Sequence, residues 1–76
     1  MQRYGNLEGD SGIAEYEFAP GRILIRFVGK PTIYEYDGMH PGARQVREMK
    51  ARAKEGRGLA TYISQRVGTN YAHKWE

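Results

Sequence analysis

Residues 13–36 have the sequence IAEYEFAPGRILIRFVGKPTIYEY, in which three short segments rich in apolar residues are joined by turn-forming pairs. Charged and apolar residues alternate in the first and third segments, which is typical of strands with one buried face. The middle segment, residues 23–28, is rich in β-branched and aromatic residues and also predicts a strand. The Pro-Gly pair at 20–21 and the Gly-Lys pair at 29–30 favour tight turns. We therefore expect a three-stranded antiparallel meander.

The alternation also separates the two faces of this sheet. With Phe18 opposite Ile23 and Val28 opposite Pro31, no charged residue falls on the aromatic face, whereas a slip of one residue would mix the two sets. The residues expected on the helix-covered face are Ala14, Tyr16, Phe18, Ile23, Ile25, Phe27, Tyr34 and Tyr36. The other face is expected to hold Glu15, Glu17, Leu24, Arg26, Val28, Ile33 and Glu35. Because that face carries no aromatic residue, we do not expect nucleobases to stack on the sheet.

The period of the apolar residues changes after residue 38. Residues 42–55 predict an amphipathic helix, and residues 59–67 predict a second, shorter one. The apolar stripe of the first helix consists of Val46, Met49 and Ala53. Gly56 and Gly68 follow the two helices, at the position where a left-handed residue commonly ends a helix. Strands followed by helices predict an α+β fold of order βββαα, with both helices packed on one face of the sheet.

Residues 13–71 are therefore interpreted as a single domain. Residues 1–12 contain three glycines and no apolar period, and they predict a flexible N-terminal segment. Residues 72–76 form a tail. Tyr71 lies just before this tail and Trp75 lies in it, and these two aromatic residues indicate that the tail packs at least partly on the domain. They would either cap the core or contact a partner.

Composition limits the function classes. A chain of 76 residues buries only about 60% of the surface that its unfolded form exposes, which leaves little room for a deep catalytic cleft. The absence of cysteine excludes disulfides and thiolate metal sites. No apolar run reaches the roughly 20 residues of a membrane span, and the first residues lack a signal-peptide pattern, so we expect no membrane partner and a cytoplasmic location.

The net charge of +3 is unevenly distributed. Residues 8–37 hold six acidic and three basic residues, a net charge of −3, whereas residues 38–76 hold eight basic and three acidic residues, a net charge of +5. A basic half of this kind indicates a polyanionic partner, although a solvated cationic surface has the same composition.

Part of this basic charge forms a stripe along one flank of the first predicted helix. The stripe consists of Arg47, Lys50 and Lys54, and it is extended beyond the helix by Arg57 and Arg66. Cations beside the edge of the core are suited to a phosphate backbone, because their stems are anchored while their charges converge. Arg44 and Arg52 lie elsewhere on the helix, and each is spaced for an i, i+4 pair with Glu48, so we interpret them as structural.

Other candidate site residues carry weaker signals. Tyr34 and Tyr36 are suited either to stacking on bases or to packing in the core, and the register favours the core. His40 and His73 have no carboxylate partner in the sequence, and no motif surrounds the two serines at 11 and 64. We therefore expect no catalytic residue, no metal site, no cofactor and no enzymatic activity.

Three segments give the chain a resemblance to a known family. They are the Y-x-Y motif Tyr34-Glu35-Tyr36, the preceding strand at 23–28, and the closing run YISQRVGTNY at 62–71. In their order and spacing they resemble the KTSC domain, a small module named for its occurrence at the C-terminus of lysyl-tRNA synthetases and also found free-standing. The chain differs from the family pattern at Pro41, which is displaced by two residues, at Ala60 in place of glycine, and at Gly68 in place of a basic residue. The family has no established activity, and its association with a tRNA synthetase implies RNA binding.

The first hypothesis is therefore that the chain is a small nucleic-acid-binding module, with RNA favoured over DNA as its ligand. The five cations of the stripe would contact phosphates with little sequence readout. The alternative is a protein-interaction module. It would use the uncovered sheet face, where Leu24, Val28 and Ile33 lie among charges, or an unpaired strand edge.

Overall fold

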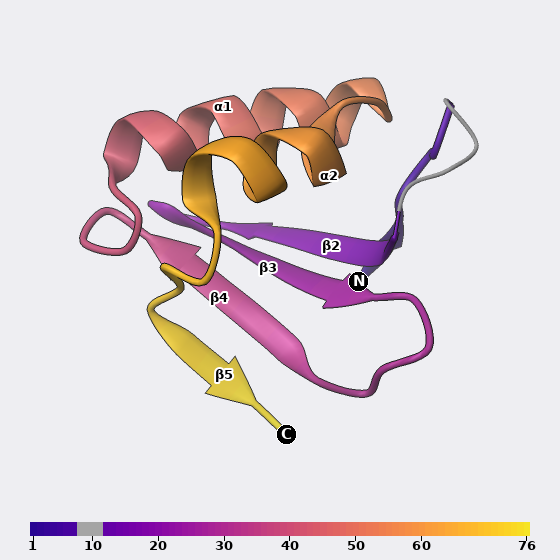
Figure 1. Cartoon of the computed structure of the whole chain (residues 1–76), viewed down its shortest axis with the longest axis horizontal. Helices are drawn as coiled ribbons and strands as arrows, with labels where there is room; N and C mark the ends of the chain where they lie inside the picture. Colours follow the sequence, from indigo (N-terminus) through magenta and orange to yellow (C-terminus); the bar gives the residue numbers. More distant parts are fainter. Residues whose placement is uncertain (8–11) are drawn as a thin grey trace.

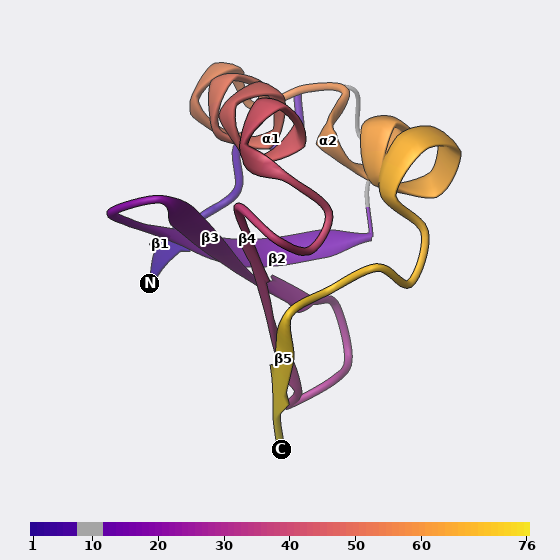
Figure 2. The same cartoon turned by 90° about the vertical axis from the view of Figure 1, so that its left-hand side faces the viewer.

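Five antiparallel strands form one sheet in the order β1-β2-β3-β4-β5, and the helices cover one of its faces (Figures 1 and 2). The computed structural model describes residues 1–7 and 12–76. The strands are β1 (Gln2–Arg3), β2 (Ile13–Ala19), β3 (Arg22–Phe27), β4 (Ile33–Asp37) and β5 (His73–Trp75). The helices are α1 (Ala43–Glu55), α2 (Leu59–Tyr62) and the π-helical turn η1 (Ile63–Val67), which continues α2. The predicted α+β class, with its antiparallel sheet and two helical segments, is confirmed, and two further strands are present.

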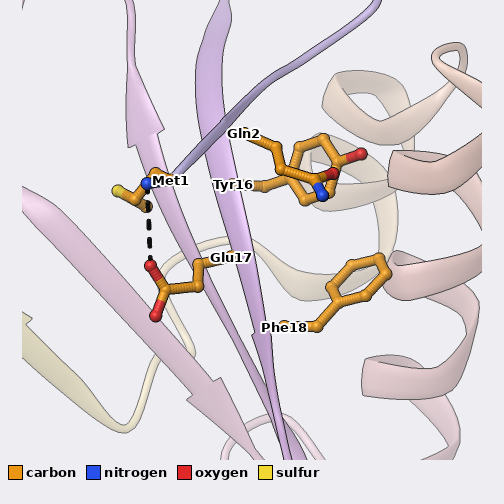
Figure 3. Close-up of a pocket in the computed structure, with 5 residues that line it drawn as sticks. All are labelled: Met1, Gln2, Tyr16, Glu17 and Phe18. Atoms are coloured by element: carbon orange, nitrogen blue, oxygen red, sulfur yellow. Dashed lines mark ion pairs between the residues drawn. The ribbon is translucent and has the colours of Figure 1, made fainter.

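The predicted register of the three central strands is confirmed. Phe18 lies opposite Ile23, and Ile23 lies opposite Tyr36. Tyr16 and Phe18 point toward the helices, whereas Glu17 between them points away and lies 3.8 Å from the N-terminal amine (Figure 3). The period of two thus sorts aromatic and charged side chains onto opposite faces.

One assignment to the core face is wrong. A register shift between Ile13 and Glu15 makes a β-bulge in β2, and Ile13 pairs with Phe27. The extra residue in a bulge changes which side chain points inward. Ile13 is therefore buried, while Ala14, which the alternation assigns to the core, is only half-buried.

The core lies between β3, β4 and the helices. Ile23, Ile25, Met49 and Leu59 are fully buried in it, and Tyr36 is 2% exposed. The predicted stripe of α1 is confirmed, because Val46, Met49 and Ala53 are the buried residues of that helix. Each of the large side chains stabilises the fold by about 1.5–3 kcal/mol through removal of apolar surface from water.

Residues 2–4 pack against the rest of the fold, within the segment 1–12 that the sequence predicts to be flexible. Gln2 pairs with Tyr16 across the β1–β2 edge, and the Tyr4 side chain is only 3% exposed. The Tyr4 ring meets Tyr16 edge-on, with 6.5 Å between centroids, and its hydroxyl accepts the backbone N–H of Leu59 at 3.3 Å. The part of the prediction that covers residues 8–11 lies outside the described residues.

The turn between α1 and α2 explains why the N-terminal segment docks there. Gly56 ends α1 in the left-handed conformation, with φ of 82°, as the sequence predicts. Its carbonyl accepts the N–H of Leu7 at 2.7 Å, and a Cβ at Gly56 would lie 3.4 Å from the Cα of Gly5. Two glycines therefore allow two backbones to approach closely.

The C-terminal tail forms β5, which extends the sheet beside β4 (Figure 1). Trp75 pairs with Ile33 and therefore lies on the face away from the helices, where its side chain stays 51% exposed. The expectation that this outer face lacks aromatic residues is wrong. The tail supplies a ring that the pattern of the three central strands does not contain.

Candidate functional site

An open groove of about 630 Å³ runs between α1 and the segment formed by α2 and η1. Its lining side chains are polar or cationic apart from one tyrosine ring. They are Arg44, Gln45, Glu48, Arg52, Tyr62, Gln65 and Arg66. We call this surface the interhelical groove. Three guanidinium groups against one carboxylate give it a net positive charge.

Arg52 forms the rigid part of this groove. Its Nε–H donates to Glu48 Oε2 at 2.7 Å, and its Nη1 donates to the carbonyl of Gly58 at 3.2 Å. The guanidinium also lies 4.9 Å from the centre of the Tyr62 ring, within the range of a cation–π contact. The predicted i, i+4 pair of Arg52 with Glu48 is thus present, and it gives Arg52 an acidic partner within the fold.

Arg44 and Arg66 enter the groove from α1 and from η1. Within the described residues neither forms an ion pair, including the i, i+4 pair predicted between Arg44 and Glu48. Both side chains are exposed. An arginine guanidinium with no acidic partner is suited to bind a phosphate through two parallel hydrogen bonds. These two residues are therefore the cations of the groove that are open to a ligand.

The predicted basic stripe is divided between two surfaces. Arg66 lines the interhelical groove, whereas Arg47, Lys50 and Lys54 lie on the opposite side of the buried stripe of α1 and do not line it. Arg57, in the turn, forms an exposed ion pair with Glu55 at 3.6 Å. We call the surface formed by Arg47, Lys50 and Lys54 the outer flank.

Lys50 differs from its neighbours on the outer flank. Its ammonium donates to the carbonyl of Ala19 at 2.8 Å and lies 5.7 Å from the centre of the Phe18 ring. Lys50 thus fastens α1 to the end of β2. Arg47 and Lys54 are exposed and form no ion pair with any described residue, which leaves them as the free cations of this flank.

A second hollow, of about 350 Å³, lies between the sheet and the end of η1. We call it the aromatic pocket. Its lining residues are Phe27, Lys30, Tyr34, Tyr36, Ile63, Gly68, Thr69 and Tyr71. Tyr36 is buried at its base, as predicted, but Tyr34 is only half-buried and lines the opening. Tyr36 thus belongs to the buried core, and Tyr34 packs against it as a partly buried residue.

The rings of this pocket contact one another edge to face. The Tyr34 centroid lies 5.5 Å from that of Phe27 and 4.9 Å from that of Tyr71. Burial raises the pKa of Tyr36, and the nearby phenols of Tyr34 and Tyr71 raise it further. The Tyr36 hydroxyl is therefore neutral at physiological pH and keeps its proton as a hydrogen-bond donor.

The outer sheet face centres on Glu35, which is 9% exposed. Its carboxylate accepts hydrogen bonds from Nη1 of Arg22 and Nε1 of Trp75, each at 3.3 Å. The centre of the His73 ring lies 4.1 Å from that of the Trp75 ring. On the neighbouring strands, Nε of Arg26 pairs with Oε1 of Glu15 at 2.7 Å. Charge on this face is thus largely balanced within the fold.

The two histidines lie apart from one another in the structure. His40 Nδ1 lies 3.0 Å from the side-chain oxygen of Asn70, and the His73 ring contacts the Trp75 ring at a tilt of 50°. No group of three or more histidine, aspartate or glutamate residues is placed to hold a metal ion in the described ranges. None of the helices found there is long and apolar enough to span a bilayer.

Sequence reasoning missed Arg44 and Tyr62 as residues of a possible site. Arg44, Glu48 and Arg52 follow one another at i, i+4 spacing, which places them in one row on the helix. The row predicts a polar face of the helix that is separate from the basic stripe. Its pairing with Arg66 depends on how α2 packs beside α1.

Comparison of the chain with protein-family models, with curated proteins and with solved structures finds no significant match. The resemblance to the KTSC domain therefore stays a prediction, which depends on the motif residues of segments 23–36 and 62–71.

Proposed function

We propose that this chain is a small nucleic-acid-binding module, which binds RNA through the phosphate backbone with little sequence readout. The observation that carries the proposal is the convergence of Arg44 and Arg66 on the interhelical groove from two helices, with no ion pair to neutralise either of them within the described chain. The resemblance to a synthetase-associated domain makes RNA the first ligand to test.

The two basic surfaces contribute differently in this proposal. Arg44 and Arg66 bind phosphates in the groove, while the tethered Arg52 holds its wall in place. Arg47 and Lys54 on the outer flank add longer-range attraction. Lys50 contributes less than the sequence predicts, because its ammonium already donates to a backbone carbonyl.

Salt dependence and charge reversal test the proposal together. Four phosphate contacts on a single strand give a log–log salt slope of about −3. Arg44→Glu and Arg66→Glu should each weaken binding of single-stranded RNA more than Arg3→Glu. Arg3 is the matched control, because it is exposed on β1 at the edge of the sheet and its reversal changes the net charge equally. Equal effects of all three variants, or no binding at low salt, would refute the proposal.

One observation favours a second function, protein interaction through the outer sheet face. Trp75 is half-exposed there, donates a hydrogen bond to Glu35 and contacts the His73 ring, and tryptophan is enriched among the residues that contribute most to protein binding energy. Chemical-shift changes confined to β3, β4 and β5 when cell extract is added, with α1 and η1 unaffected, would favour this alternative.

A further inference from the structure

We propose that the aromatic pocket accepts one nucleobase of a single-stranded nucleic acid, whose adjoining phosphate is bound by Lys30. This inference rests on the proposed function and extends it from the phosphate backbone to a base. The pocket lies on the helix-covered side of the sheet and opens beside η1.

The walls of the pocket are suited to a flat ring. Phe27, Tyr34 and Tyr71 are half-buried, so part of each ring remains accessible. Neighbouring rings meet edge to face at 71° and 70° and leave ring surface available for a stacked guest. Aromatic side chains of this kind bind every base, because each base has a π-face. A hollow of about 350 Å³ lies at the lower end of the range for ligand sites, which fits one base and excludes several.

The pocket also has groups that can bind the polar edge of a base. Three phenols gather at it, and the one at its base, Tyr36, stays protonated. The backbone at Gly68 has open space beside it, since a Cβ there would meet nothing within 4 Å. Bases carry donors and acceptors on their edges, whereas a purely apolar ligand would leave the phenols without partners.

The charge at the rim favours a nucleotide over an uncharged aromatic ligand. Lys30 is exposed, and within the described residues it forms no ion pair. Among the described residues that line the pocket, none carries a carboxylate. Lys74 lies opposite Tyr34 on β5 and adds a second cation on the same side of the sheet, although it pairs with Glu76 at 3.7 Å.

The position of the pocket connects it to the interhelical groove. The turn η1 and the residues after it line both hollows: Gln65 and Arg66 face the groove, while Ile63, Gly68 and Thr69 face the pocket. A single strand that crosses η1 would therefore place a phosphate on Arg66 and a neighbouring base against the accessible ring surface of Tyr34 or Tyr71. Stacking of the base in the aromatic pocket would hold in place the nucleic-acid strand that the interhelical groove attracts.

The test uses the full chain in NMR titrations with uridine, with uridine 5′-monophosphate and with a uridine hexanucleotide. The mononucleotide should shift the amides of Phe27, Lys30 and the 68–71 segment, and it should bind more tightly than the nucleoside. Tyr71→Leu, which removes the ring but keeps apolar bulk, should weaken hexanucleotide binding at least about tenfold, the loss of one base–aromatic stack. Phe18→Leu is the matched control, because Phe18 is a partly exposed aromatic residue outside the pocket, and it should leave binding unchanged.

Lys30→Glu keeps the test decisive if Tyr71→Leu does not fold, since Lys30 is exposed. It should reduce the affinity of the mononucleotide to that of the nucleoside. Equal hexanucleotide binding by the wild type and Tyr71→Leu would overturn the pocket inference while leaving the proposed function intact. Absence of hexanucleotide binding to the wild type would overturn both. Preference for an aromatic peptide over the nucleotide at the same amides would also overturn the inference.

Discussion

Replacing Tyr4 with alanine should remove a large share of the stability of this domain. The side chain is 3% exposed, contacts the Tyr16 ring edge-on and accepts the N–H of Leu59. Truncation of a buried aromatic residue costs about 3–5 kcal/mol, from lost transfer free energy and the remaining cavity. A chain of this length has a free energy of unfolding of roughly 4–11 kcal/mol, at the usual value per residue. The variant should therefore be marginally folded.

A matched series separates the ring of Tyr4 from its hydroxyl. Tyr4→Phe keeps the ring and removes the acceptor of the buried Leu59 N–H, which should cost about 1 kcal/mol. Leu7→Ala, in the same segment but largely exposed, should change stability by less than about 0.5 kcal/mol. Urea unfolding followed by circular dichroism gives the midpoint and slope for each variant, and unchanged slopes are expected.

The result that would refute this reasoning is a Tyr4→Ala variant as stable as Leu7→Ala. Residues 2–4 would then be dispensable for the fold, and the flexible N-terminal segment predicted for residues 1–12 would be the correct description. A loss of more than about 2 kcal/mol in Tyr4→Phe would also contradict it, because the hydroxyl and not ring burial would then dominate.

Three further predictions concern the turns and the outer flank. The Asp37 carboxylate accepts hydrogen bonds from two backbone N–H groups of the following turn, chiefly that of His40, and these bonds lower its pKa. The ionised carboxylate therefore contributes its full stabilisation of the fold above the ordinary carboxyl pKa of about 4, and this contribution is lost as the pH falls through the lowered pKa of Asp37. Below pH 4 the wild type should lose stability more steeply than Asp37→Asn in acid unfolding, and parallel curves would contradict this. Gly56→Ala should cost more than Gly21→Ala in thermal unfolding, by about 1 kcal/mol, because both have positive φ but only Gly56 has a backbone neighbour in close contact. Lys50→Met should destabilise by about 1 kcal/mol while changing RNA affinity less than Arg44→Glu, and the opposite ranking would show that its ammonium is free in solution.

The central sheet was predictable because its information is local. Short turns bring consecutive strands together, so Phe18 opposite Ile23 sets the pairing of β2 with β3, and Val28 opposite Pro31 sets that of β3 with β4. The period of two then sorts side chains by face without reference to any distant segment. The bulge at Ile13 escaped this reasoning, because an inserted residue leaves no mark on the composition of β2.

The two edge strands were not predictable for the opposite reason. Gln2–Arg3 and His73–Trp75 are two and three residues long, too short for any period, and they are strands because β2 and β4 offer them unpaired edges. The same holds for the burial of Tyr4, which needs a helix turn more than 50 residues away along the chain.

Local alternation and helical period, as properties of the sequence itself, determine the α+β class, the central register and which flank of α1 each cation occupies. The tertiary structure decides which cations meet. Helical spacing gives an angle about the axis of one helix, but it does not say on which side of α1 the next helix packs, so Arg66 joins Arg44 instead of Arg47. The aromatic pocket likewise combines Tyr34 with Tyr71, which are far apart in the sequence and meet only when the C-terminal segment pairs with β4. Contacts between distant segments depend on packing free energy summed over the whole core, which no local pattern contains.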